Sequence, residues 1–334
     1  IVAKIRNVRR GGEQVVTEGG KVSFRHTVLP YWLWGSLRPR IADGNGSATR
    51  ANVTAMTESD ILAALETRLG HVHAKLRLGI EQDHEARVFG EGIRFFHLEN
   101  WYSVHSLIRN SLRFTGLLGR ARRNALAIQV REHPVTLERL PPAFDGYTLL
   151  HLSDLHLDIN DGTLDAISRS VRELPPYDAC VLTGDYRART YGDIDETLRR
   201  LERLRVHLGE RVFAVLGNHD SVRMVPAIEA MGVRVLLNES VPIARGDQNI
   251  YLAGIDDAHY FRVDSIEKAA ETLPLDAVRI LLSHTPEIYR QAACAEFDLM
   301  LCGHTHGGQI CLPGGYPVTL DARIPRRLGR GRWE

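Results

Sequence analysis

The stretch "DACVLTGD" (residues 178–185) points to the fold class, because an uninterrupted apolar run ends there in a glycine and a carboxylate. Apolar residues without polar alternation predict a strand buried on both faces, as in a parallel sheet. Similar runs occur before and after it: "YTLLHLS" (147–153), "RVFAVLG" (211–217), "VRILLSH" (278–284) and "FDLMLCG" (297–303). Each run predicts a further strand of the same kind.

Helical segments separate these strands along the chain. Helices are predicted near 163–173, 193–207, 222–231 and 265–272, and further strands near 125–135, 233–237 and 250–254. Alternation of buried strands with helices predicts a layered α/β domain that begins at about residue 124, with a sheet that is largely parallel in its first half.

The composition excludes several classes of protein. The 334 residues carry 42 basic and 41 acidic side chains, so a net charge of +1 gives no general attraction to nucleic acid. The four cysteines show no CxxC spacing, which favours a reducing compartment over a disulfide framework. No apolar run reaches the roughly 18 residues of a membrane-spanning helix.

The segment before Met56 differs from the rest, since it is basic, rich in glycine and without a sustained period. Residues 1–55 are expected to be a disordered or non-native extension; a genuine but irregular extension is the alternative. A helix is predicted over about 57–78, with Thr57 or Ser59 as its N-cap.

A basic amphipathic helix is predicted over 101–123, within a helical region that covers 56–123. Apolar residues such as Trp101 and Leu107 share one face, and Arg109 and Arg113 lie opposite. Such a helix lies in an anionic membrane interface, or packs on its own domain with its arginines in solvent; both interpretations stay open.

Polar side chains follow five of the predicted strands at the point where each strand ends. They are Asp154 and His156, Asp185, Asn218 with His219 and Asp220, His284, and His304 with His306. Each alone is typical of a turn or a cap. Together they gather at the carboxyl edge of the sheet, where ligand sites form. Carboxylate, amide and imidazole without thiolate suit two divalent ions.

The ordered motifs "DLH", "GD", "GNHD", "SHTPE" and "GHTHGGQI" resemble the calcineurin-like metallophosphoesterase superfamily. Within it, the last two motifs are similar to the bacterial branch of YkuE/YaeI-like phosphohydrolases. The resemblance covers about 147–313 and implies a layered β-sandwich flanked by helices, here with an N-terminal helical extension. Members usually continue beyond the last motif, so the domain over 124–334 is expected to be C-terminally truncated.

The resemblance also implies how two divalent metal ions (Mn, Fe or Zn) are held. One ion would take Asp154, His156 and His306, and the other Asn218, His284 and His304. Asp185 would bridge the pair, which keeps two cations close enough to activate a shared water and to neutralise phosphate oxygens.

Three further residues receive roles near the metals. By resemblance, His219 lies beside the substrate phosphate, where it stabilises charge or protonates the leaving oxygen. Asp220 is expected to orient the His219 imidazole or to cap the next helix. Arg187 either reaches a phosphate or faces solvent.

The sequence therefore predicts a two-metal phosphoesterase that acts on a phosphoester or diphosphate. The basic segment 101–123 favours a lipid-linked substrate and a cytoplasmic protein held peripherally on the inner face of the membrane. The alternative is a non-catalytic scaffold of the same fold that binds a partner protein. Nucleic acid is not expected to be the substrate, because no basic groove is evident in the sequence of the catalytic half.

Overall fold

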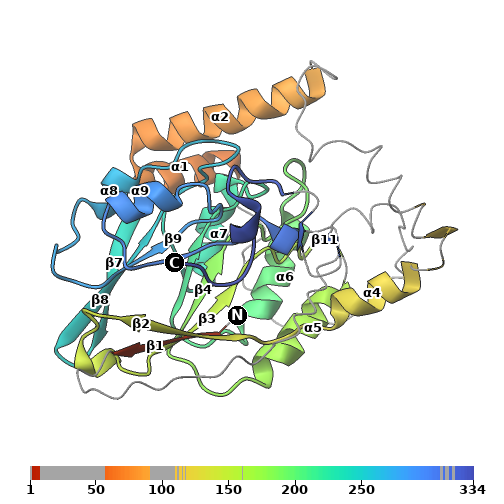
Figure 1. Cartoon of the computed structure of the whole chain (residues 1–334). Coiled ribbons are helices and arrows are strands. Elements are labelled where there is room, and N and C mark those ends of the chain that lie inside the picture. The colour runs from red at the N-terminus through yellow and green to blue at the C-terminus, as the bar shows by residue number, and fades with distance from the viewer. Residues whose placement is uncertain are drawn as a thin grey trace.

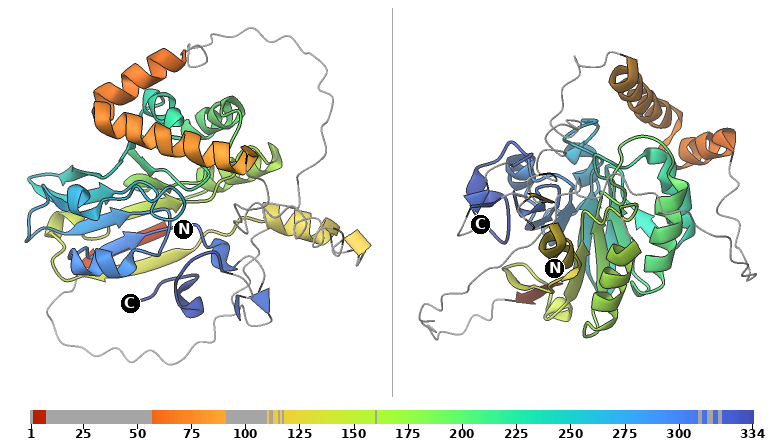
Figure 2. Two further views of the ribbon diagram at one scale, coloured as in Figure 1. Left: turned by 90° about the horizontal axis from the view of Figure 1, so that it is seen from above. Right: turned by 90° about the vertical axis from the view of Figure 1, so that its right-hand side faces the viewer.

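The computed structural model describes residues 2–7, 57–90, 110, 113–114, 116, 118–159, 161–308, 311–312, 316–317 and 320–334. Two sheets lie face to face, and helices cover the outer face of each (Figures 1 and 2). The predicted layered β-sandwich flanked by helices is therefore confirmed.

The larger sheet has the strand order β2-β1-β3-β4-β5-β6. Its strands are β1 (Val2–Asn7), β2 (Glu132–Leu137), β3 (Thr148–Leu152), β4 (Ala179–Thr183), β5 (Val212–Val215) and β6 (Val233–Val235). Strands β3 to β6 are all parallel, as the sequence predicted, with Leu152 opposite Leu182 and Thr183 opposite Val215. This register brings the residues that follow β3, β4 and β5 to one edge.

The smaller sheet has the order β10-β9-β8-β7. Its strands are β7 (Glu239–Arg245), β8 (Gln248–Gly254), β9 (Arg279–Leu282) and β10 (Leu299–Leu301). Strands β8, β9 and β10 are parallel, so β9 and β10 also end at a common edge. Strand β7 pairs antiparallel with β8 and was not predicted. Its sequence, ESVPIAR, contains neither an apolar run nor a clear alternation of apolar and polar residues.

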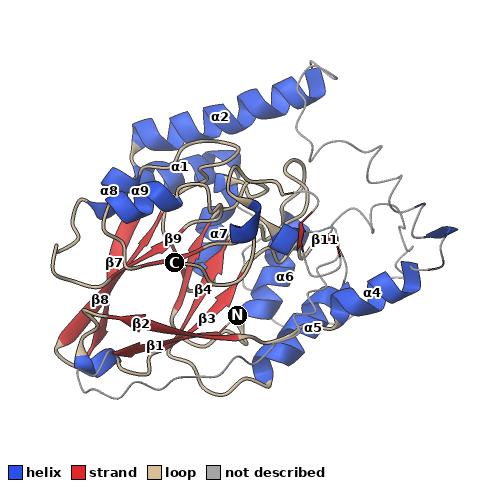
Figure 3. Cartoon of the chain, in the orientation of Figure 1, coloured by secondary structure: helices blue, strands red, loops and turns tan. Residues whose placement is uncertain are grey.

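The core between the sheets is built from side chains of both, including Val181 and Val215 from the larger sheet and Leu252 and Ile280 from the smaller one. The opposite faces of the strands pack under helices, which explains why the strands are apolar throughout (Figure 3). Helices α5 (Asp161–Arg172), α6 (Asp195–Arg205) and α7 (Val225–Ala230) cover the larger sheet; α8 (Ile266–Ala270) and α9 (Tyr289–Cys294) cover the smaller one.

The predicted N-terminal helix is instead a pair, α1 (Glu58–Leu69) and α2 (His71–Gly90). Thr57 is the N-cap of α1, in a capping box with Asp60. The break falls at Gly70, whose φ of 83° lies in the left-handed region that glycine alone adopts without strain. Leu65 and Ala74 pack into the core around α5 to α7, so this hairpin joins the sandwich.

Most of the amphipathic helix predicted over 101–123 lies outside the described residues, and only its end coincides with α4 (Leu118–Leu126). The strand predicted over 125–135 begins later than expected, at Glu132, because α4 occupies the start of that range. Strand β1 pairs with β2 and β3, whereas residues 8–55 of the expected extension are not described. Among the described helices, none has the length and apolarity to cross a membrane.

Candidate metal centre

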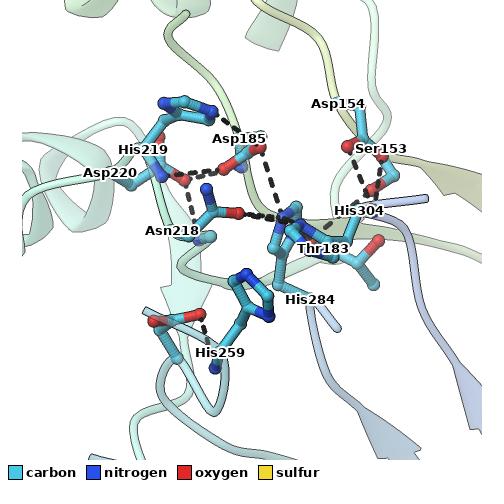
Figure 4. A network of polar contacts seen from close by, with 12 residues as sticks. Ser153, Asp154, Thr183, Asp185, Asn218, His219, Asp220, His259, His284 and His304 are labelled. Atoms are coloured by element: carbon cyan, nitrogen blue, oxygen red, sulfur yellow. Dashed lines mark hydrogen bonds and ion pairs between the residues drawn. The ribbon is translucent and has the colours of Figure 1, made fainter. Parts of the chain in front are cut away.

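The residues that follow β3, β4, β5, β9 and β10 meet at one edge of the two sheets, where the close-up view shows Asp154, Asp185, Asn218, His284 and His304 together (Figure 4). The sequence predicted this convergence from the position of each polar residue after an apolar strand. The parallel pairing of the strands within each sheet explains this convergence, because the carboxyl ends of parallel strands lie at the same edge of the sheet.

The backbone at this edge adopts a conformation that costs energy. Of the described non-glycine residues with positive φ, five belong to the candidate ligands: Asp154 (53°), His156 (41°), Asp185 (56°), His304 (69°) and His306 (46°). Each such position costs of order 1–3 kcal/mol and persists only where the surroundings impose it. Strain concentrated at one place is typical of a functional site.

A first group of potential ligand atoms comes from Asp154, His156, Asp185 and His306, all within 4.8 Å of one another. Nε2 of His306 lies 3.4 Å from Nε2 of His156 and 3.4 Å from Oδ1 of Asp154. The two imidazole rings are stacked with an interplanar angle of 14°, and their Nε2 atoms lie at the same end of the stack.

A second group comprises Asp185, His284 and His304, and the side chain of Asn218 joins it. Oδ1 of Asn218 lies 2.9 Å from Nε2 of His284 and 2.9 Å from Nδ1 of His304. Oδ2 of Asp185 lies 3.2 Å from the same His284 nitrogen. Asp185 therefore belongs to both groups. A third group consists of His259, His304 and the exposed Asp321. It shares His304 with the second group.

These residues fit divalent cations by two tests. Ligands bound at about 2.1 Å lie roughly 3.0 Å apart in an octahedron and roughly 3.4 Å apart in a tetrahedron, and the separations of 2.9 to 3.4 Å in this site are close to these values. In addition, backbone carbonyls fix the histidine tautomers. Nδ1 of His156 donates to the carbonyl of Arg187 (2.9 Å), and Nδ1 of His284 donates to that of Thr183 (2.7 Å). A carbonyl only accepts, so Nδ1 of each ring carries a hydrogen, and Nε2 is the atom that can ligate a cation.

The electrostatics of the centre also favour cations. Burial lowers the pKa of His304 to about 3, and it lowers the pKa of His306, which keeps both imidazoles neutral. Burial alone would lower the pKa of His284, but the carboxylate of Asp185 raises it to about 10. Burial opposes the charge of Asp185, yet His284 and His219 hold its pKa well below the usual range. A cation bound here would replace the proton of His284.

Glycine is required where the backbone passes the carboxylates. A Cβ atom on Gly303 would lie 2.4 Å from Oδ2 of Asp154, and one on Gly217 would lie 2.2 Å from Oδ1 of Asp185. Both distances are too short for any side chain, which explains the glycine before each of the motifs "HTH" and "NHD".

His219 stands beside these groups and belongs to neither of them. Its Nδ1 lies 2.8 Å from the hydroxyl of Thr190, and its Nε2 faces Oδ2 of Asp185 at 3.9 Å. Burial lowers the pKa of His219 to about 4, against the opposing charge of Asp185. The ring is therefore neutral near pH 7 and is suited to donate a hydrogen bond at the edge of the centre.

Asp220 does not orient the His219 ring, contrary to the expectation from the sequence. Its Oδ2 accepts hydrogen bonds from the amides of Asp185 (2.7 Å) and Gly217 (2.9 Å), and its Oδ1 accepts one from the amide of Tyr186 (3.0 Å). Nor does Asp220 cap the next helix, since the N-cap is Ser221. Asp220 instead fixes the backbone on both sides of Asp185. Burial raises its pKa to about 7.

Arg187 is neither exposed nor free to reach a phosphate. Its side chain is buried, and its guanidinium donates to the carbonyls of His219 (2.6 Å), Gly192 (3.1 Å) and Thr190. It holds the loop that carries Thr190 against His219. Thr190 could not be predicted from the sequence, since a threonine in a polar loop has no distinctive spacing.

His259 is a further residue at this edge. Its ring centroid lies 4.3 Å from that of His304, and its Nδ1 lies 3.2 Å from Oε2 of Glu287. The neighbouring Asp257 accepts hydrogen bonds from the amides of Tyr260 (2.7 Å) and Phe261 (2.6 Å), which shapes the 256–262 loop. This loop therefore borders the candidate centre.

Comparisons with known proteins agree with this geometry. The model of the calcineurin-like phosphoesterase family matches residues 147–308. The chain is 30% identical to the uncharacterized metallophosphoesterase YkoQ of Bacillus subtilis, over 64% of this chain and 80% of YkoQ. It is 29% identical to the phosphodiesterase YaeI of Escherichia coli, over 50% of this chain and 63% of YaeI. It is also 32% identical to a Bos taurus transmembrane protein with a metallophosphoesterase domain, over 65% of this chain and 51% of that protein, so it spans about half of the bovine relative.

Proposed function

This chain belongs to the calcineurin-like phosphoesterase family, as its motifs predicted, and we propose that it hydrolyses a phosphoester or diphosphate bond with two divalent cations. The observation that carries the proposal is the position of Asp185, which contributes to both groups of potential ligands. A carboxylate shared in this way supports a pair of ions rather than a single one. Members of this family bind divalent metals, and Mn, Fe and Zn all suit carboxylate, amide and imidazole ligands.

The candidate ligands and His219 would have separate roles in hydrolysis. When bound, two cations lower the pKa of a shared water and neutralise phosphate oxygens. Asp154, His156 and His306 would hold one ion, and Asn218, His284 and His304 the other, with Asp185 common to both. His219, held by Thr190, would donate a hydrogen bond to the phosphate.

Metal removal tests the proposal directly. A chelated sample is expected to lose hydrolysis of bis-p-nitrophenyl phosphate, and added Mn²⁺ is expected to restore it, because the cations would activate the water and neutralise the phosphate oxygens. Release of p-nitrophenolate is the measurement, with p-nitrophenyl phosphate run in parallel to separate diester from monoester cleavage. A chain that binds the metal and hydrolyses neither compound would support the non-catalytic scaffold instead.

We further propose that the substrate is lipid-linked and is met at the inner face of a membrane. The support is charge: Arg113, Arg120 and Arg123 are exposed at the end of the basic segment 101–123. Helix α4 packs beside α5, and Arg169 and Arg172 of α5 line a surface cavity of about 300 Å³ together with Arg203 of α6 and a single carboxylate, Asp165. Cationic side chains clustered in this way attract anionic headgroups.

Vesicle binding tests the membrane proposal. Reversal of charge at Arg113, Arg120 and Arg123, each to Glu, is expected to weaken binding to phosphatidylglycerol vesicles by at least about 10²-fold, since each arginine near such a surface contributes about 1 kcal/mol. Co-sedimentation measures it. Reversal of the exposed Lys268, Arg290 and Arg327 is the matched control and is expected to have a smaller effect. Equal losses in the two triple variants would refute a contact through this segment.

A further inference from the structure

Helix α2 carries buried charge next to the candidate metal centre, although it lies outside the segment matched by the family model. Arg77 is fully buried and Glu81 is 5% exposed. They lie one helical turn apart, and Nη1 of Arg77 contacts Oε1 of Glu81 at 2.7 Å. Charged groups seldom lie this deep unless each is paired.

Glu81 binds the segment that follows β5. Its Oε2 accepts a hydrogen bond from the Ser221 hydroxyl (2.6 Å), and its Oε1 accepts one from the amide of Val222 (2.7 Å). The same segment begins with Asn218 and His219. The carboxylate therefore anchors the far end of the loop that brings these two side chains to the centre.

Arg77 binds a different loop, the one that follows β8. Its Nε donates to Oδ2 of Asp256 (2.9 Å), and its guanidinium lies 4.0 Å from the centre of the Phe261 ring. Both residues belong to the 256–262 loop, which carries His259 against His304. One helix thus holds two loops that border the centre from separate sheets.

Other contacts also dock the hairpin. Leu65 and Ala74 pack into the core beside α7, and Arg68 of α1 pairs with Glu229 and Glu239, neither of which belongs to the candidate centre. Replacing buried ion pairs by apolar packing is often neutral or stabilising, so the buried charges of α2 call for a role beyond docking. Their contacts with both loops provide one.

We propose that Arg77 and Glu81 are positioning residues, which hold the Asn218–Val222 segment and the 256–262 loop in the geometry that the metal centre needs. The proposal rests on the proposed function, because it concerns turnover at that centre. Residues that orient ligands from outside the coordination sphere typically change metal affinity or activity by about 10–100-fold when they are replaced.

Two variants of the full chain test this positioning role. Glu81→Gln keeps the shape of the side chain and removes its charge, and Arg68→Gln weakens docking of the same hairpin away from the centre. Glu81→Gln is expected to lower kcat for bis-p-nitrophenyl phosphate at saturating Mn²⁺ by about tenfold and to weaken Mn²⁺ binding. Arg68→Gln is expected to lower the melting temperature by at least as much while kcat stays within about twofold, since its contacts are with α7, β6 and β7 and with none of the candidate ligands.

Equal losses of kcat in the two variants, or no loss in Glu81→Gln, would overturn the proposal. If Glu81→Gln does not fold, Ser221→Ala can be used instead, because it removes only the hydroxyl that Glu81 binds. This variant is expected to lower kcat by about threefold. An unchanged kcat in Ser221→Ala would also overturn the proposal. A wild-type chain that shows no metal-dependent turnover contradicts the proposed function. Mn²⁺ affinity, measured by electron paramagnetic resonance, then tests the positioning role separately.

Discussion

The Asp185→Asn variant is expected to fold normally and to lose hydrolysis of bis-p-nitrophenyl phosphate by at least about 10³-fold, because stabilisation by two cations amounts to several kcal/mol. The substitution is nearly isosteric, and the amide oxygen still accepts the hydrogen bond that the His219 amide donates to Oδ1 (3.0 Å). The substitution removes the negative charge of Asp185, which belongs to both groups of potential ligands. Metal content per chain and kcat are the two measurements.

A matched control uses the other end of the same strand. Asp178 lies just before β4, and its Oδ2 accepts a hydrogen bond from the amide of Thr148 (2.7 Å). Asp178→Asn makes the same change of charge far from the centre, so metal content and kcat should stay close to those of the wild type. If Asp185→Asn kept two metal equivalents per chain, Asp185 would not be shared between ions.

The convergence of the candidate ligands could be predicted from the sequence because it depends on simple regularities. Apolar runs mark buried strands, parallel strands end at a common edge, and polar residues at those ends must meet. Asp154, Asp185 and Asn218 follow neighbouring strands of one sheet, and His284 and His304 follow neighbouring strands of the other. None of these positions needs a side-chain conformation to be known in advance.

The contacts around those residues could not be predicted, because they depend on loop geometry. Asp220 follows His219 directly, yet its carboxylate turns to the backbone of Asp185, and Thr190 reaches the imidazole instead. A pattern of residue types does not distinguish such neighbours. The contact between Glu81 and Ser221 joins residues 140 positions apart, and nothing in either segment predicts the other.

The break at Gly70 was missed for a related reason. The residues on both sides of it favour a helix, so propensity predicts one continuous helix, and a single glycine is often tolerated inside a helix. Packing of the hairpin against the core decides the outcome, through Leu65 before the turn and Ala74 after it.

The His219→Ala variant is expected to keep its metals and to lose kcat by about 10²-fold, since the imidazole lies outside both groups of ligands and would act on the reacting phosphate. Thr190→Val removes the hydroxyl that holds the ring and is expected to cost less, about tenfold, because the imidazole remains. Metal content and kcat are again compared. Loss of metal in His219→Ala would make the residue a ligand instead.

The leaving group separates the two roles that His219 can have. Burial lowers its pKa to about 4, and bound cations lower it further, so the protonated ring is scarce near pH 7 and increases only as the pH falls toward that value. We therefore expect hydrogen-bond donation rather than proton transfer. A donor to a phosphate oxygen acts on any ester, so His219→Ala should slow p-nitrophenyl and alkyl phosphodiesters by similar factors. A much larger loss with the alkyl ester, whose leaving oxygen needs a proton, would identify His219 as the general acid.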